Sequence, residues 1–432
     1  MKAKEIILLI FIVVAGVIFY YAQTGQLHIN IDWDGGFFFY QEEFSFDELQ
    51  VIDPPFPREL KLINAHSDVA VQGTGEEKIT ISFKKTIRSK DEEEAKEVSD
   101  KLKMVIDKNG DLLKISTTRE KFKRKRFRTD FKIFLPANMD IKVDNSYGLV
   151  EVSRVGNTNI NNPHGETIVS DINGELIIQN SYENIDVKRI ETDCRIDNKH
   201  ASVHINDVKG NTTIFHKYGE IHLENLSQDV SIDGSHSEIF GRKLAGPIKI
   251  ETSYENIILF DIGPTEIKSN HSDVEIKGAE NNLSITDRYG KVELNDIRGD
   301  LKVEGKNLEV YGNTIHGEKI LISTSYEDIE LYEFSGEAKI FLAHGDMLLK
   351  PSPLSHDLEV KGEYAGIDLH WPTGEKYPVE AKSQGGEIKW NIPAELSFKE
   401  ENSLSVIRAF IQEIGKPSIL LSTTYGDIKI EE

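Results

Sequence analysis

A tyrosine or histidine returns about every 18 residues between Tyr147 and Tyr364, and the two residue types alternate. The series is interrupted at Asn307 and otherwise consists of Tyr147, His164, Tyr182, His200, Tyr218, His236, Tyr254, His271, Tyr289, Tyr326, His344 and Tyr364. A short fixed period is the signature of a solenoid, in which each unit packs against its neighbours alone. This period therefore constrains the fold before any other feature of the chain is considered.

Each repeat carries apolar residues at fixed offsets of +3, +5, +8, +12 and +14 from its tyrosine or histidine. For Tyr218 these positions hold Ile221, Leu223, Leu226, Val230 and Ile232. A spacing of two within each pair indicates a β-strand. Glycine often follows at +10, which indicates a tight corner. One unit therefore contains two short strands joined by corners.

Such a unit buries its apolar side chains only when the next copy stacks on it through parallel ladders, about 4.8 Å away. We therefore predict an all-β protein, a single-stranded parallel β-helix with coils of about 18 residues. Counted from Tyr147 to Tyr425, this gives about 16 coils. A coil of 36 residues, holding one tyrosine unit and one histidine unit, remains an alternative.

Composition agrees with a thin, soluble rod. The hydrophobic fraction of 38% is low and suits a solenoid in which few side chains per coil point inward. The net charge of −22 argues against nucleic acid as a partner. Cys194 is the only cysteine, so no intramolecular disulfide can form, and its place among the inward positions predicts a core residue.

The N-terminus predicts a membrane anchor. Residues 6–22 are apolar apart from Gly16, and Lys2 and Lys4 precede them. This length is at the lower end for a spanning helix, and the lysines favour a cytoplasmic N-terminus. Tyr20-Tyr21-Ala22 is a poor cleavage site. We therefore expect residues 1–22 to be an uncleaved signal anchor in the cytoplasmic membrane, with the C-terminal domain outside the cytoplasm; cleavage is the alternative.

Three further regions follow this anchor. Residues 23–59 are expected to form a stalk, and residues 60–135 an N-terminal β segment with a basic strand and one inserted helix at about 90–106, capped by Ser89 and Glu92. The repeat domain then occupies residues 136–432. Residues 397–415 interrupt its period, and we expect a cap there that contains a short helix at 406–414.

Two stretches resemble a known family. Asn145-Ser146-Tyr147-Gly148-Leu149-Val150-Glu151-Val152 and residues 424–430 are similar to the recurring element of the bacterial putative-adhesin domain of unknown function. Residues 134–143 resemble the strand-turn-strand entry of that family. The resemblance covers about residues 60–430 and implies a right-handed parallel β-helix on an envelope-associated protein. It supplies no catalytic residues, and the strict alternation of tyrosine with histidine departs from the family pattern.

The aromatic series is the first candidate binding surface. If the rings point outward they could bind a glycan, and if inward they pack the corners. The residues concerned are Tyr147, Tyr182, Tyr218, Tyr254, Tyr289, His164, His200, His236 and His271. In coils of 18 residues successive histidines are about 9.6 Å apart, too far to share a zinc ion, whereas a 36-residue coil would bring them to about 4.8 Å. We therefore predict no metal and no cofactor.

A basic segment is the second candidate, for contact with an anionic surface. It comprises Lys121, Lys123, Arg124, Lys125, Arg126 and Arg128 in an otherwise acidic chain. The alternative is a solvated strand end balanced by nearby acids. Acidic residues that recur with the repeat, such as Asp273 and Asp427, are interpreted as a solvated face, because the glycine-rich signature of calcium-binding β-rolls is missing.

No catalytic motif accompanies these features, so we predict that the protein is not an enzyme. The sequence favours a membrane-anchored, externally displayed β-solenoid with an adhesin-like binding or scaffold role toward a glycan, an envelope polymer or a membrane protein. One alternative is an envelope-stress accessory protein that binds a membrane sensor. A lesser alternative is a carbohydrate-active β-helix enzyme. The sequence does not indicate an oligomeric state.

Overall fold

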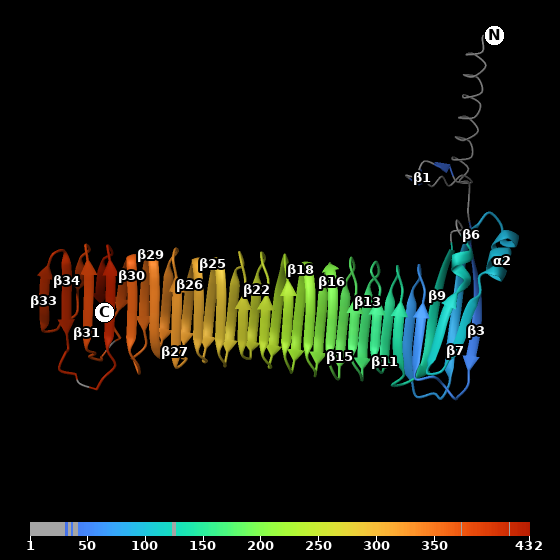
Figure 1. The fold of residues 1–432 in the computed structure, drawn as a ribbon, viewed down its shortest axis with the longest axis horizontal. Coiled ribbons are helices and arrows are strands. Elements are labelled where there is room, and N and C mark those ends of the chain that lie inside the picture. Colours follow the sequence, from blue (N-terminus) through green and yellow to red (C-terminus); the bar gives the residue numbers. More distant parts are fainter. Residues whose placement is uncertain (1–30, 33–35, 38–41, 123–126, 373, 414) are drawn as a thin grey trace, which may run out of the picture.

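The computed structural model describes residues 31–32, 36–37, 42–122, 127–372, 374–413 and 415–432. They form an all-β solenoid of about 13 turns with one α-helix. Over residues 140–370 the strands follow one another along the long axis in sequence order, from cyan-green to orange (Figure 1). The predicted all-β solenoid is thus confirmed. The expected anchor at 6–22 lies outside the described residues, and no helix within them is long and apolar enough to cross a membrane.

Each turn contributes two strands, of which the one after the aromatic position is usually the longer, and strands of each kind pair in parallel with their counterparts in the next turn. The long-strand ladder includes β5 (Val69–Thr74), β11 (Val150–Val155), β13 (Thr167–Ile172), β15 (Ile185–Ile190), β17 (Val203–Val208), β20 (Ser237–Leu244), β22 (Ile257–Ile262), β24 (Val274–Ala279) and β28 (Ile329–Phe334). The short-strand ladder includes β4 (Glu59–Ile63), β10 (Asp140–Asp144), β12 (Thr158–Asn161), β14 (Leu176–Gln179), β16 (Cys194–His200), β19 (Val230–Gly234), β21 (Ile248–Glu251), β23 (Thr265–Lys268) and β27 (Lys319–Thr324).

Some strands run through a corner and belong to both ladders. They are β18 (Thr212–Leu226), β25 (Leu283–Ile297), β26 (Leu301–Ile315), β29 (Glu337–Pro351) and β30 (Leu358–His370). The register decides the coil length, because Thr167 pairs with Ile185, and Ile185 pairs with Val203. Each step spans 18 residues, so the 18-residue coil is confirmed and the 36-residue alternative is wrong.

The two ladders enclose a single apolar core. Along each strand buried and more exposed residues alternate, as in β12 and β14, because successive side chains of a strand point to opposite faces. The inward residues form one continuous cluster from Leu60 to Ile430. Cys194 is 1% exposed within it, as predicted from its inward offset.

Two kinds of corner join the ladders. The aromatic corner, between a short strand and the next long strand, carries the tyrosine or histidine; the glycine corner, between a long strand and the next short strand, carries the +10 glycine. At the glycine corner the chain turns through a residue at +7 with positive φ, for example Arg189 at 56°. This position is polar in most turns, namely Arg154, Asp171, Arg189, Asp207, Asn225, Lys243, Asp261, Asp296, Thr314 and Glu333. The sequence did not reveal it, because glycine, the usual signal, occupies it at Gly278 alone of the turns described.

At Gly299 and Gly174, whose φ is not positive, close approach of the neighbouring turn requires the +10 glycine. A Cβ built on Gly299 would lie 2.2 Å from the carbonyl oxygen of Asn281 in the preceding turn. A Cβ on Gly174 would lie 2.6 Å from the backbone nitrogen of Asn157. Adjacent turns therefore touch backbone to backbone at this corner, which leaves no room for a side chain.

The N-terminal end is closed by antiparallel strands. β3 (Glu42–Ile52) pairs with β6 (Ile79–Ser89), which pairs with β9 (Phe127–Pro136) beside β5. In the other ladder, β7 (Met104–Asn109) and β8 (Leu112–Thr117) form a hairpin beside β4. β3 lies within the expected stalk at 23–59 and is a strand of this cap. β1 (Ile31–Asp32) and β2 (Gly36–Phe37) pair with each other, and a 3-10 turn η1 covers Thr118–Lys121.

The inserted helix is shorter than predicted. α2 spans Glu92–Lys101, and its N-cap is Asp91, whose side chain accepts a hydrogen bond from the Glu94 backbone N–H. Ser89 therefore does not cap the helix; its hydroxyl donates to the Glu94 carboxylate instead. Val105 was expected on the helix but lies in β7 and is 40% exposed.

At the C-terminal end the strands leave sequence order. β35 (Ile419–Thr424) and β36 (Ile428–Glu431) pair with β30, and the earlier strands β31 (Val379–Gln384) and β32 (Ile388–Trp390) pair on their far side. The last turn of the chain is thus inserted between two earlier ones. This out-of-order insertion, together with the cap beyond it, explains why the run of successive turns is about 13 rather than the 16 predicted.

A hairpin of β33 (Leu396–Glu401) and β34 (Leu404–Ala409) pairs antiparallel with β31 and covers its edge. A cap was expected at 397–415, but the helix predicted at 406–414 is wrong. Val406 and Ile407 lie in β34, where they pair with Lys382 and Ala381 of β31, and this pairing determines the local conformation.

Candidate binding surfaces

The tyrosines and histidines of the aromatic corners stack on one another along the outside of the solenoid and form the aromatic column, which is interrupted at Asn307. Rings in adjacent turns have centroids 4.5–5.3 Å apart and lie nearly parallel in most pairs. The tyrosines are 42–63% exposed. The rings therefore point outward, which the sequence left open, and each residue in the predicted series lies in the column.

The column is longer than the sequence series. His66 stacks on Tyr147 at one end, with centroids 4.5 Å apart, and Tyr364 stacks directly on Tyr425 at the other, at 5.2 Å. Both extensions join residues that are distant in sequence, so periodicity could not place them in the column. Asn307 interrupts it, in register with Tyr289 below and Tyr326 above.

Buried asparagines lie at the corner that presents four of the rings. Asn145, Asn162, Asn180 and Asn198 each precede their tyrosine or histidine by two residues and are at most 4% exposed. The amide nitrogen of Asn180 donates to the Gly165 carbonyl of the preceding turn, and its oxygen accepts the N–H groups of Ser181 and Tyr182. A buried amide that satisfies backbone groups of two turns fixes the corner. The sequence contained this signal in the recurring asparagine, but its role was not recognised.

Stacking limits what the column can bind. Both faces of an internal ring are covered by its neighbours, so these tyrosines offer solvent their edges and hydroxyl groups rather than faces for a sugar. Neighbouring histidines of the column are separated by a tyrosine, as His164 and His200 are by Tyr182. This arrangement agrees with the spacing argument against a zinc ion shared along the column.

His216 occupies the asparagine position of its turn and is 2% exposed. Its Nδ1 is 2.7 Å from the Ser237 hydroxyl and its Nε2 is 2.8 Å from the Ala201 carbonyl oxygen. Burial lowers the pKa of His216 below its ordinary value. The histidine–serine contact is enclosed in the corner, where no substrate reaches it, so it is a structural contact.

The repeated acids bond to the backbone of the next turn. Asp273 accepts the N–H of Lys291, Asp328 that of Asp346, and Asp427 that of Glu387. These carboxylates thus accept hydrogen bonds from backbone N–H groups at the start of long strands, which the ladder leaves without a backbone partner. The sequence interpretation as a merely solvated face was incomplete.

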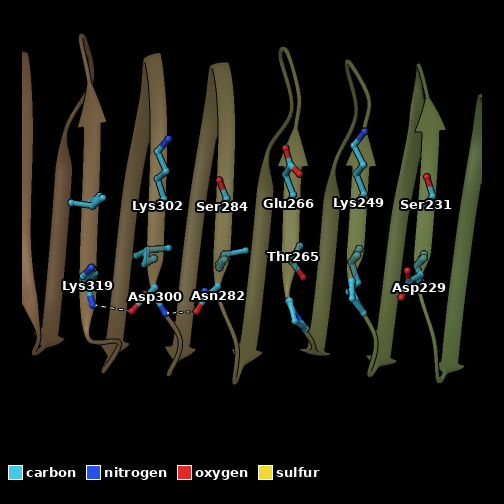
Figure 2. Close-up of a pocket in the computed structure, with 17 residues that line it drawn as sticks. Asp229, Ser231, Lys249, Thr265, Glu266, Asn282, Ser284, Asp300, Lys302 and Lys319 are labelled. Carbon is cyan, nitrogen blue, oxygen red and sulfur yellow. Dashed lines mark hydrogen bonds between the residues drawn. The ribbon is translucent and has the colours of Figure 1, made fainter.

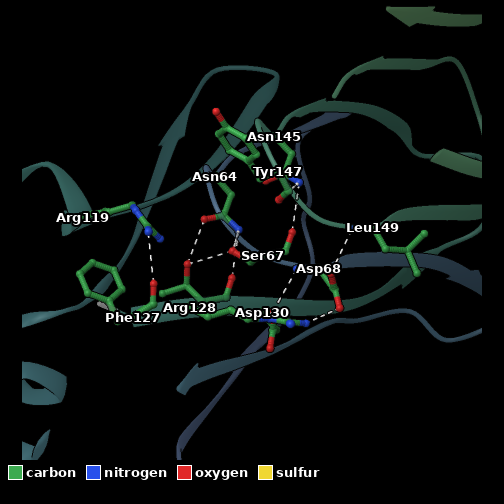
Figure 3. A network of polar contacts seen from close by, with 11 residues as sticks. Asn64, Ser67, Asp68, Arg119, Phe127, Arg128, Asp130, Asn145, Tyr147 and Leu149 are labelled. Carbon is green, nitrogen blue, oxygen red and sulfur yellow. Dashed lines mark hydrogen bonds and ion pairs between the residues drawn. The ribbon is translucent and has the colours of Figure 1, made fainter. Parts of the chain in front are cut away.

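The basic segment is partly neutralised within the N-terminal cap (Figure 3). Arg128 forms ion pairs with Asp68 and with Asp130, and Asp68 also accepts the backbone N–H of Leu149. Lys121 is exposed at the end of η1. Lys123, Arg124, Lys125 and Arg126 lie outside the described residues, so contact with an anionic surface stays a prediction.

A groove of about 650 Å³ lies on the outer face of the short-strand ladder, beside the glycine corners (Figure 2). Its floor is one row of outward residues in consecutive turns: Ser231, Lys249, Glu266, Ser284, Lys302 and Leu321. Pro247, Pro264 and the apolar side chain of Leu321 supply apolar surface to it. Because the aromatic corners lie at the other end of each short strand, the groove and the column occupy opposite edges of this ladder.

The groove is close to electroneutral. Lys249 pairs with Glu251 at 2.8 Å, Glu266 with Lys268 at 2.5 Å, and Lys302 with Glu304 at 3.0 Å. Each pair lies along a single strand, on residues two positions apart that point to the same face. The surface thus combines apolar patches with many hydrogen-bonding groups and little net charge. The sequence analysis did not find it, because outward positions vary in identity from turn to turn.

The C-terminal part of this solenoid matches a known family. Residues 260–431 match the Toastrack DUF4097 family. The resemblance to a putative-adhesin domain of unknown function is thereby confirmed. The Toastrack region contains the column from His271 to Tyr425 and most of the groove.

Other comparisons add little to the Toastrack match. No curated protein matches the sequence. A solved structure described as a putative cell adhesion protein from Clostridium sporogenes is 10% identical, covering 90% of this chain and 99% of that one, with a TM-score of 0.19. At that score the likeness carries no argument about fold or function.

Cys194 does not act as a nucleophile. Its side chain is buried in the core, and burial raises the pKa of the thiol to about 12. A thiol with that pKa is protonated at neutral pH and out of reach of a substrate.

Proposed function

We propose that this protein is a non-catalytic, adhesin-like binding rod displayed outside the cell, and that its ligand is an extended, uncharged glycan lying along the solenoid axis in the groove. The observation that carries the proposal is the row from Ser231 to Leu321, which places one outward side chain in each of six consecutive turns. Turns repeat about every 4.8 Å. A sugar unit in an extended glycan advances by a similar distance, so successive units meet equivalent positions.

The charge of the protein favours a neutral polymer over a polyanionic one. Lys249 and Lys302 of the groove are paired with glutamates, and the chain carries a net charge of −22. A polyanionic envelope polymer would be repelled by this field, whereas a hydroxyl-rich neutral chain would not. Pro247 and Pro264 supply apolar contact for the C–H faces of sugar rings.

In this proposal the aromatic column acts mainly as a stiffener. Stacked aromatic pairs contribute roughly 0.5–1.5 kcal/mol each beyond area burial. The tyrosine hydroxyls and the histidine edges remain available for hydrogen bonds to a ligand. The membrane anchor at 6–22, with a cytoplasmic N-terminus, belongs to the same proposal and rests on the hydropathy and charge of the sequence.

Charge reversal in the groove tests the proposal. The full chain carrying Lys249→Glu and Lys302→Glu should lose binding to neutral β-linked oligosaccharides, because the new carboxylates repel Glu251 and Glu304 and distort the row. Lys277→Glu, on the outer face of β24 in the other ladder, makes the same charge change outside the groove and should bind as the parent does. Equal binding by both variants would overturn the proposed site.

A further inference from the structure

Three potential metal ligands converge where the inserted last turn meets β30. Asp368 and His370 lie two residues apart on the outer face of β30, and Glu431 of β36 is the register partner of His370. Their ligand atoms all lie within 4.8 Å of one another. None of these residues belongs to the aromatic column, and none lines the groove.

The spacing suits a transition-metal ion. His370 Nε2 is 3.8 Å from Asp368 Oδ1 and 3.6 Å from Glu431 Oε1. Metal–ligand bonds of about 2.0–2.1 Å in a tetrahedron place ligand atoms roughly 3.4 Å apart. Both measured distances are too long for hydrogen bonds, yet a small inward movement gives this spacing.

A second observation points to the same place. Asp368 Oδ1 is buried and has no hydrogen-bond partner within the described chain. An unsatisfied carboxylate oxygen is costly to bury unless something fills its coordination. The same atom is one of the three that converge.

Lys429 stands at the edge of this cluster. Its Nζ is 2.5 Å from Glu431 Oε1 and 3.2 Å from Asp368 Oδ2. The lysine side chain is 40% exposed, so it can turn into solvent. Its ammonium therefore marks where positive charge is favourable, and it competes with any ion that binds there.

We propose that Asp368, His370 and Glu431 form a binding site for one divalent transition-metal ion, of the zinc class, on the outer face of the last turn. An imidazole with two carboxylates favours zinc, cobalt or nickel over calcium and magnesium, which prefer oxygen ligands. Water completes the coordination. The ion joins β30 to β36, strands separated in the chain by the whole excursion through β31–β34.

Zinc titration of the purified full chain, stripped with chelator, tests the site. The stacked pair His204 and His222, with centroids 4.7 Å apart, is a competing surface for zinc. All variants are therefore made in a background carrying His204→Ala and His222→Ala. In that background calorimetry should show one zinc ion per chain, and cobalt should give the visible absorption of a tetrahedral nitrogen–oxygen site.

Two variants move the affinity in opposite directions. His370→Ala should lower zinc affinity at least tenfold and abolish the cobalt absorption, whereas Lys429→Met should raise the affinity because the competing ammonium is removed. His316→Ala, which alters an exposed histidine elsewhere, should change neither. Zinc binding that is absent in the background, or unchanged by His370→Ala, would overturn the proposal. An affinity that falls in Lys429→Met would also contradict it.

Discussion

At the scale of single residues, the buried side chain two positions before the ring holds the aromatic corner in several turns. Asn162 at this position bonds to backbone groups in two turns, because its amide donates to the carbonyls of Gly148 and Glu166. His216 makes equivalent contacts with a titratable ring. The ring that follows is then held at the surface, where it stacks on its neighbours.

Filling the gap at Asn307 should stabilise the protein. Asn307→His restores the alternation between Tyr289 and Tyr326 and adds two stacked contacts. We expect a gain of about 1 kcal/mol in the free energy of unfolding, measured in urea. Asn307→Ala is the control and should give no gain. A histidine that fails to stabilise would show that stacking contributes little to this column.

His216 should make stability depend on pH. Its pKa is lowered in the folded state, so below about pH 6.5 the unfolded chain binds more protons than the folded one. The free energy of unfolding is therefore undiminished above that pH and falls as the pH drops toward the lowered pKa. His216→Asn, which introduces the residue that the preceding turn has as Asn198, should flatten this part of the curve. Equal slopes in the parent and in His216→Asn would refute the assignment.

At the scale of elements, the glycine corner depends on backbone contact between turns. Gly299→Ala should lower the free energy of unfolding by about 2 kcal/mol or more, because the added methyl group meets the Asn281 carbonyl and both turns must shift. Gly75→Ala is the matched control, since no atom lies within 4 Å of its added Cβ. Thermal unfolding of the two variants measures the difference. Equal melting temperatures would contradict the close approach.

The amide hydrogens of the inserted last turn should exchange slowly with solvent. Although β35 and β36 end the sequence, each is paired on both sides, so their amide hydrogens should be as protected as those of central turns such as β15. The peptide of β33, which is paired on one side alone, should exchange quickly. Hydrogen exchange by mass spectrometry compares them. Rapid exchange across 419–431 would show that the chain does not end inside the stack.

Much of this element-level organisation was predictable. The offsets of Ile221 and Leu223 from Tyr218 gave the strands, and the period gave an 18-residue coil over its alternative. The terminal turns were not predictable, because pairings such as Tyr364 with Tyr425 join distant segments that no local period relates. The sequence did not predict the groove or the Asp368 cluster, for a related reason. Outward residues such as Lys249 differ from turn to turn, so only the register brings them into a row.

At the scale of the whole molecule, the protein is a stiff rod whose exposed rows repeat once per turn. The single core runs the length of the solenoid, and antiparallel strands close both ends. A rod of this kind offers an extended ligand many weak contacts, one at the corresponding position of each turn, rather than one deep pocket. Its affinity should therefore depend on how many turns the ligand spans.

The most direct test is the affinity of the full chain for neutral β-linked oligosaccharides of increasing length. Because the row from Ser231 to Leu321 spans six turns, affinity should rise with each added sugar up to about six units and then level off. An affinity that is independent of length, or no binding at any length, would contradict an extended ligand in the groove.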